Sequence, residues 1–160
     1  MRATINSRRS PCVSGRARLT IMATVFLIIG SVFVVVAAVV HLLIFFMESV
    51  LWSNPKVWKR LGLTTQDEAD VTRPMAYNQG FYNAFLALGA GVGLVMMAST
   101  NWAQGGVALA LFATLSMLLA SIVLLTSNPK LLRAALIQGA APLLGIIFLV
   151  AAMALVPSAG

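Results

Sequence analysis

Charged side chains are scarce in this chain, and acidic ones are almost absent. Only 9% of the 160 residues are charged and only four are Asp or Glu, whereas 60% are hydrophobic and the mean hydropathy is +0.95. A soluble domain carries roughly 25% charged residues on its surface. A chain with so few charges cannot cover a globule with polar groups, so we expect lipid to face much of its apolar surface.

Residues that bind metals or form disulfides are also few. The chain has one cysteine, Cys12, and one histidine, His41, so an internal disulfide is excluded and a zinc site of the usual spacing cannot be built. The glycines at 89, 91 and 93 lack the spacing of a phosphate-binding loop. We therefore expect no metal and no cofactor.

The net charge of +7 is unevenly distributed. Five of the eleven basic residues precede the first long apolar run, and the others lie in or beside two loops. A nucleic-acid-binding protein needs a folded basic face with polar or aromatic side chains that read the ligand. No such face is indicated, so we expect no nucleic-acid partner and attribute the basic residues to membrane topology.

Four apolar runs, at about 22–51, 77–98, 105–126 and 131–156, are each long enough to cross a membrane. A crossing needs about 20 residues, and in lipid the backbone polar groups must pair within the segment, so each run is predicted to be a helix. The predicted fold is an all-α integral membrane four-helix bundle over residues 22–157, with the lipid bilayer as its surroundings. The first run exceeds one crossing and must tilt or project.

The loops predict an orientation in the cell membrane. Loops 53–75 and 127–133 hold six basic residues, whereas loop 99–104 and the tail after Pro157 hold none. Basic loops stay in the cytoplasm, so these two should be cytoplasmic and both termini outside. The arginines within residues 1–21 oppose this orientation. We interpret 1–21 as a basic, disordered extension and Met22 as a candidate true start, which N-terminal sequencing of the mature protein would test.

The first loop contains two local signals. Pro55 can open a short interfacial helix with Val57, Trp58 and Leu61 on its apolar side, although an ordinary loop fits the segment equally well. Residues Thr65 to Glu68 match a capping box, and Pro74 is predicted to end the helix that follows.

An internal similarity suggests two related halves. The tetrapeptide Ser-Asn-Pro-Lys occurs at 53–56 and again at 127–130, and a Gln-Gly pair follows at 79–80 and at 138–139. This pattern is typical of a two-plus-two parallel repeat. The alternative is that Asn-Pro is a common helix stop and Lys a common cytoplasmic anchor.

Polar residues within the apolar runs gather toward one leaflet. His41, Glu48 and Trp52 share one face of the first helix with Phe45. The candidate ligand-binding residues are His41, Glu48, Asn78, Gln79, Tyr82, Asn83 and Gln138. Ionisable groups inside a membrane usually serve a function, but amides and histidines also join helices by hydrogen bonds. For Tyr82 and Trp52 an interfacial aromatic belt is the simpler explanation.

Small residues predict close helix contacts. Gly89 and Gly93 form a small-xxx-small step, and Ala141 and Gly145 are available on the last helix. We expect this face to pack against another helix and to be a candidate homodimer surface. Pro142 should bend the last helix and free a carbonyl near Gln138.

Three segments carry a resemblance to a known family. They are His41 with Phe45-Phe46-Met47-Glu48 and Leu51-Trp52, then Asn78-Gln79-Gly80-Phe81-Tyr82-Asn83-Ala84-Phe85-Leu86-Ala87, and then Gln138-Gly139-Ala140-Ala141-Pro142. Over about 22–155 the chain resembles the bacterial membrane family labelled domain of unknown function 1304. The resemblance implies a four-helix membrane protein that begins near Met22. It implies no established activity, although some members carry an epimerase label.

Three functions remain open at this point, and whether the protein is an enzyme is open with them. The first is binding of a small or amphipathic ligand in a polar pocket of the cytoplasmic leaflet, for transport or sensing. The second is an intramembrane acid–base isomerase or epimerase with Glu48 and His41 as its catalytic residues. The third is a structural subunit of a membrane complex.

Overall fold

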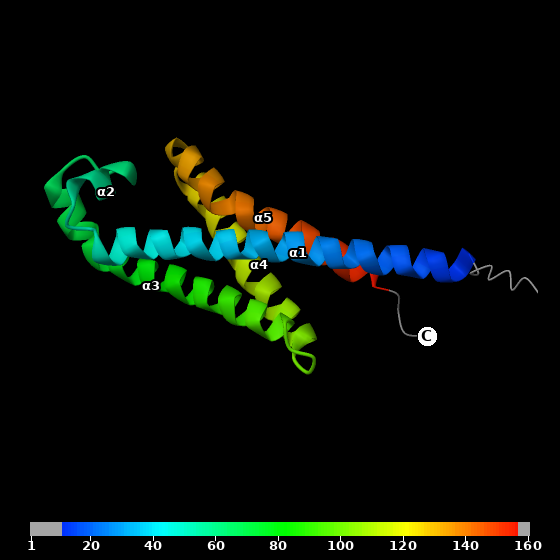
Figure 1. Cartoon of the computed structure of the whole chain (residues 1–160). Coiled ribbons are helices and arrows are strands. Elements are labelled where there is room, and N and C mark those ends of the chain that lie inside the picture. The colour runs from blue at the N-terminus through cyan, green and yellow to red at the C-terminus, as the bar shows by residue number, and fades with distance from the viewer. Residues whose placement is uncertain (1–10, 157–160) are drawn as a thin grey trace, which may run out of the picture.

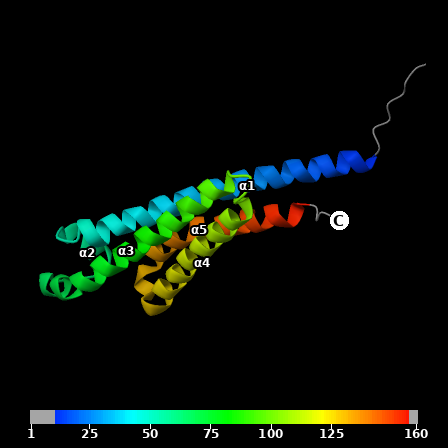
Figure 2. The ribbon, with the colours of Figure 1, turned by 90° about the horizontal axis from the view of Figure 1, so that it is seen from below.

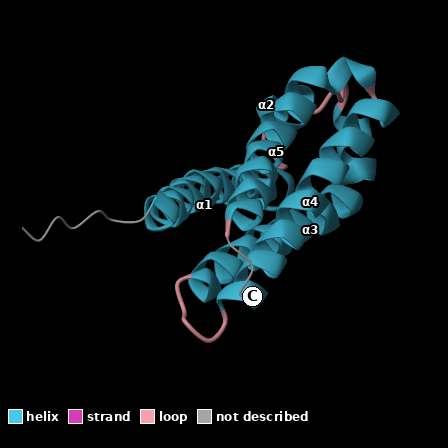
Figure 3. Ribbon diagram, turned by 90° about the vertical axis from the view of Figure 1, so that its right-hand side faces the viewer, coloured by secondary structure: helices cyan, strands magenta, loops and turns pink. Residues whose placement is uncertain are grey.

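The computed structural model describes residues 11–156, and the regular structure in this range is helical throughout. Figure 3 shows these helices joined by short loops. Their bounds in chain order are α1 (Pro11–Phe45), a π-helical turn η1 (Phe46–Val50), α2 (Pro55–Arg60), α3 (Gln66–Met97), α4 (Ala103–Ser127), a 3-10 turn η2 (Pro129–Leu131) and α5 (Leu132–Leu155).

Four helical segments are long and apolar enough to cross a membrane. They are α1 continued by η1, α3, α4, and α5 preceded by η2. Large apolar side chains remain exposed along all of them, as at Ile28, Phe85, Val123 and Val150. Such extensive apolar exposure is expected where lipid rather than water surrounds the helices. The predicted all-α membrane bundle is therefore confirmed.

The four long helices form a ring in which each packs mainly against two neighbours, with a small direct contact between α1 and α4. Helix α1 packs against α3 and α5, and α4 packs against the same two, so α1 lies opposite α4 and α3 lies opposite α5 (Figures 1 and 2). The loop containing α2 and the turn η2 lie at the same end of the bundle (Figure 1). The buried centre consists largely of small side chains, including Ala37, Ala90 and Ala110, with Met117 and Leu149 as the larger members.

Glycine seams bring the neighbouring helices close together. A Cβ on Gly93 would lie 2.8 Å from the backbone nitrogen of Ala110 in α4, and a Cβ on Gly89 would lie 3.8 Å from the Cβ of Ala113. The step at 89 and 93 thus packs against α4 within the chain, and not against the last helix. That expectation about the partner helix was wrong because α3 and α5 are diagonal in the ring. Gly145 of α5 packs against Val34 of α1 instead.

The start of α3 differs from the sequence expectation. The helix begins at Gln66, well before residue 77, and the predicted capping box of Thr65 and Glu68 is present. Pro74 lies inside α3 and does not end it. Its side chain is exposed, and a proline inside a helix removes one backbone hydrogen bond. Because residues 66–76 include five charged or amide side chains, hydropathy alone predicted a loop for them.

At the N-terminus, residues 11–21 continue α1. The expected disordered extension therefore differs from the structure over 11–21, where the helix simply extends past the apolar run, while residues 1–10 lie outside the described residues. Translation from Met22 stays a prediction.

The two Ser-Asn-Pro-Lys segments adopt the same local structure. The side chain of Asn54 accepts a hydrogen bond from the backbone N–H of Lys56 at 3.0 Å, and that of Asn128 accepts one from Lys130 at 3.2 Å. In both, proline occupies the first turn of a short helix. The first of these is the predicted helix after Pro55, and its apolar residues Val57 and Trp58 are buried. The second is a single 3-10 turn that leads directly into α5.

Candidate ligand-binding site

A cavity of about 610 Å³ lies at the end of the bundle that carries α2. Its walls come from the end of α1 with η1, from the first half of α3, from Leu124 near the end of α4, and from η2 and the start of α5. Residues Arg60, Leu61 and Leu63, at and after the end of α2, form a further side. Small-molecule sites usually measure about 300–1,000 Å³, so the cavity is large enough to hold a ligand.

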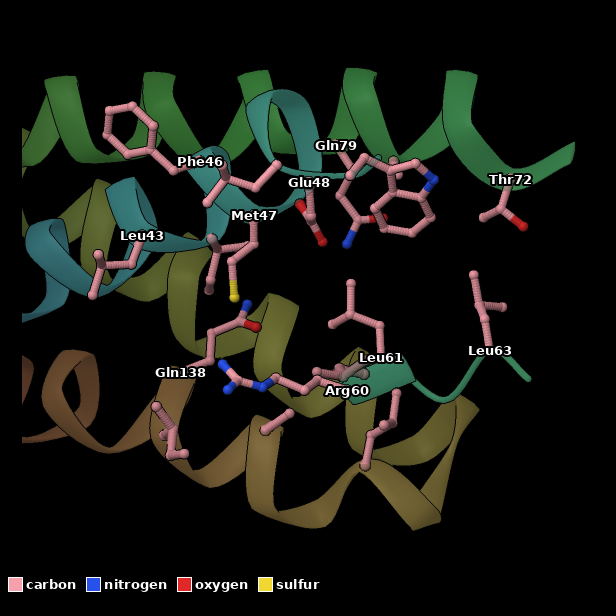
Figure 4. Close-up of a pocket in the computed structure, with 18 of the residues that line it drawn as sticks. Leu43, Phe46, Met47, Glu48, Arg60, Leu61, Leu63, Thr72, Gln79 and Gln138 are labelled. Carbon is pink, nitrogen blue, oxygen red and sulfur yellow. The ribbon is translucent and has the colours of Figure 1, made fainter. Parts of the chain in front are cut away.

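The cavity is apolar except for a few polar groups on facing walls. Figure 4 shows Glu48 and Gln79 pointing inward from one wall, and Gln138 pointing inward from the opposite wall with the guanidinium of Arg60 beside it. Leu43 and Phe46 lie to one side of this polar group, and Leu63 and Thr72 to the other (Figure 4). An apolar chamber with a few convergent polar groups is the usual form of a ligand-binding site.

The π-helical turn places Glu48 at the cavity wall. The backbone N–H of Leu51 donates to the carbonyl of Phe46 at 2.8 Å, five residues back, and the hydroxyl of Ser49 donates to the carbonyl of Tyr77 in α3 at 2.9 Å. A Cβ on Gly80 would collide with the Ser49 hydroxyl and lie 3.2 Å from the Cβ of Glu48. Single π turns occur frequently at functional sites, and this one depends on glycine at position 80.

Asn83 holds the carboxylate of Glu48 from behind. Its side-chain Nδ2 donates to Glu48 Oε2 at 3.2 Å and to the carbonyl of Gln79 at 3.1 Å. Glu48 and Asn83 are both buried, each with 6% of its surface exposed. Asn83 is not among the residues that line the cavity, so it positions the carboxylate without facing a ligand.

A double-mutant cycle should detect this contact. We expect Glu48→Ala and Asn83→Ala to be coupled by about 1 kcal/mol, since buried interhelical hydrogen bonds in membrane bundles are worth roughly 0.6–2 kcal/mol. The free energy of unfolding in sodium dodecyl sulfate measures the coupling. Strictly additive losses would show that the two side chains do not interact.

His41 lies outside the cavity. It is fully buried, its Nδ1 lies 2.9 Å from the carbonyl of Ala37 one turn earlier, and its Nε2 has no hydrogen-bond partner among the residues that the structure describes. Among the expected site residues, the structure brings Glu48, Gln79 and Gln138 to one cavity and leaves His41 in the bundle interior.

Asn78 and Tyr82 do not line the cavity either. The side chains of both are exposed, and Tyr82 lies with Phe85 and Phe112 along a separate groove between α3 and α4. Positions 78 and 82 are four residues apart and share a side of α3, and neither lines the cavity.

A family model matches residues 35–150 of the chain, a range that includes η1, the cavity and most of α5. The chain belongs to the family described as Protein of unknown function (DUF1304). The cavity-lining residues all fall within the matched range. No curated protein and no solved structure matches the chain.

Two polar residues of this DUF1304 protein's cavity, Arg60 and Thr72, were not predicted from the sequence. The apolar residues Val57, Trp58 and Leu61 indicated a helix that could lie on a surface, but not that it folds back over the end of the bundle. Trp58 packs there with Trp52, Ala69 and Ala76, which carries the last residue of α2 to the cavity.

Trp52 also differs from expectation. Its indole N–H donates to the carbonyl of Ala69 at 2.9 Å, and only 6% of the side chain is exposed. In this DUF1304 protein it is therefore an internal packing residue that joins the end of η1 to α3, since its polar atom is paired inside the protein and not at a lipid interface.

Proposed function

We propose that this membrane protein binds a small amphipathic ligand in the cavity between η1, α3 and α5, in the service of transport or sensing. The observation that carries the proposal is the cavity itself, with Glu48 and Gln79 facing Gln138 and Arg60 across apolar walls. Leu43, Leu51 and Met75 line it and are exposed, so the cavity is open along part of its wall. A ligand with an apolar portion would contact these side chains from the lipid side.

The distribution of charge supports a cytoplasmic orientation of this cavity under the same proposal. Six basic residues lie at the end of the bundle with α2 and η2, namely Lys56, Lys59, Arg60, Arg73, Lys130 and Arg133. The turn at the other end, between α3 and α4, carries no charged side chain. Because basic loops remain in the cytoplasm, the cavity would be reached from that side of the cell membrane.

The acid–base isomerase has less support than ligand binding. That mechanism needs two proton-transferring groups within reach of one substrate. Glu48 lines the cavity, but His41 does not. A purely structural subunit would not explain why polar groups converge on the cavity.

A single substitution should close the cavity without harming the bundle. We expect Ala134→Phe to fill it, since Ala134 lies on its wall, and to abolish stabilisation by a bound ligand. The matched control is Ala140→Phe on the same helix, whose exposed side chain does not line the cavity. The measurement is thermal unfolding of the purified protein with a panel of lipids, isoprenoids, quinones and small amphiphiles.

A ligand at 100 times its dissociation constant adds about 2.7 kcal/mol of stability. We expect at least one ligand of the panel to stabilise the wild type and Ala140→Phe but not Ala134→Phe. If no ligand distinguishes the two variants, the cavity is not a binding site. Both variants should unfold near the wild-type temperature when no ligand is present.

A further inference from the structure

The guanidinium of Arg60 faces the cavity without an acidic partner among the described residues. Three of the four acidic residues accept hydrogen bonds from other groups: Glu48 from Asn83, Glu68 from Thr64 and Thr65, and Asp70 from Gln66. Arg60 instead lies beside the amide of Gln138 (Figure 4). A guanidinium with an amide next to it presents several N–H donors in a planar arrangement, which suits a phosphate or a carboxylate.

The opposite wall has the complementary chemistry. The Oε2 atom of Glu48 accepts one hydrogen bond from Asn83, and a carboxylate can accept several. Gln79 extends beside Glu48 into the same space (Figure 4). This wall therefore suits a hydrogen-bond donor, and a positively charged donor best. The two walls differ in charge and are separated by the cavity, so one ligand can contact both.

We propose that the ligand is an amphiphile whose head group joins an anionic group, bound by Arg60 and Gln138, to a hydrogen-bond donor such as an ammonium, bound by Glu48 and Gln79. Its apolar chain lies along the side of the cavity formed by Val40, Leu43 and Ile44. This assignment rests on the proposed ligand-binding function and adds the chemical class of the ligand.

Tryptophan fluorescence can test the head group directly. The chain has three tryptophans; Trp52 lines the cavity, Trp58 packs beside it, and Trp102 lies in the turn at the other end of the bundle. In a Trp102→Phe background the signal comes from the cavity end alone. The probes are the octyl ester of phosphoethanolamine, octyl phosphate, octylamine and octyl glucoside. Phosphoethanolamine without the octyl tail tests whether binding needs the apolar part of the ligand.

We expect the octyl ester of phosphoethanolamine to bind most tightly and saturably. Arg60→Ala should weaken binding of the two octyl probes that carry a phosphate about tenfold or more, since hydrogen bonds to charged groups are the strong ones. Lys56→Ala is the matched control, because it removes the same charge from α2 at a residue that does not line the cavity; it should change affinity less than about twofold. Glu48→Gln should weaken the phosphoethanolamine ester and leave octyl phosphate unaffected.

Each other outcome overturns a defined part of the proposal. Equal affinities of Arg60→Ala and Lys56→Ala for the phosphate probes, or tightest binding of octylamine or octyl glucoside, would overturn the anionic head group. Tail-free phosphoethanolamine binding as tightly as its octyl ester would overturn the amphiphile and point to a water-soluble ligand with the same head group. Saturable binding that Ala134→Phe abolishes would still support the cavity in all these cases, whereas no binding by any probe would count against the proposed function as well.

Discussion

Gly93→Ala should destabilise this protein severely, whereas Gly91→Ala, two residues earlier on the same helix, should not. A Cβ at 93 would lie 2.8 Å from the backbone nitrogen of Ala110 and 3.0 Å from the carbonyl oxygen of Gly106, so α3 and α4 must move apart. A Cβ at 91 meets nothing within 4 Å. Overpacking costs about 1–3 kcal/mol of stability and occasionally more. Because the atoms in the way belong to the backbone of α4 and cannot change rotamer, we expect a loss of stability at the upper end of that range.

The measurement is the temperature at which the detergent-solubilised protein loses its monodisperse elution peak. For Gly93→Ala we expect a decrease of about 10 °C, using 2–4 °C per kcal/mol for a chain of this size. Gly91→Ala should match the wild type or exceed it slightly, because alanine favours helix over glycine by up to about 1 kcal/mol. Equal losses in the two variants would show that the seam between α3 and α4 is not packed as described.

Gly80→Ala should disrupt the π turn and, with it, the candidate ligand site. The new Cβ would collide with the hydroxyl of Ser49, which is held by its hydrogen bond to the carbonyl of Tyr77, and would press on the Cβ of Glu48 at 3.2 Å. We expect a loss of about 2 kcal/mol in stability. We also expect weaker ligand binding, because the carboxylate of Glu48 must move.

The Ser49→Ala variant separates this collision from a general effect of alanine. Removing the hydroxyl should make Gly80→Ala about 1 kcal/mol less destabilising than in the wild type, a coupling that a double-mutant cycle measures. Gly89→Ala is the control on the same helix, since its Cβ would make an ordinary contact of 3.8 Å with Ala113. If Gly80→Ala is as destabilising in the Ser49→Ala background as in the wild type, the close approach of η1 to α3 at Gly80 is not what positions Glu48.

Hydropathy was sufficient to predict the four helices, because lipid leaves a long apolar segment no alternative to a helix. The capping box at Thr65 was also readable, since it depends only on local spacing. The order of helices around the ring was not readable. Small residues occur on α3, α4 and α5 alike, so the pattern that predicts a close contact does not name the partner helix.

The site could be predicted only in part for a related reason. Glu48, Gln79 and Gln138 were found because each is a polar residue in an apolar run, at a similar depth from the same end. His41 is also a polar residue in an apolar run, but it lies seven residues before Glu48, about 10 Å deeper along the helix, and is buried in the packed interior. Arg60 was missed because an arginine in a basic loop is ordinary. Its role depends on how α2 folds back over the cavity, which only the tertiary packing of Trp58 determines.

The two Ser-Asn-Pro-Lys turns bear on how many ligands one chain is expected to bind. A ring with α1 opposite α4 and α3 opposite α5 has the helix order of two equivalent hairpins related by a twofold axis. Each hairpin also has a glycine against a serine, Gly80 on Ser49 and Gly139 on Ser121. The symmetry ends after the turn, where α2 and its following loop are present in the first half only. Arg60 therefore has no counterpart in the second half, so we expect the proposed site to occur once per chain and to bind one ligand.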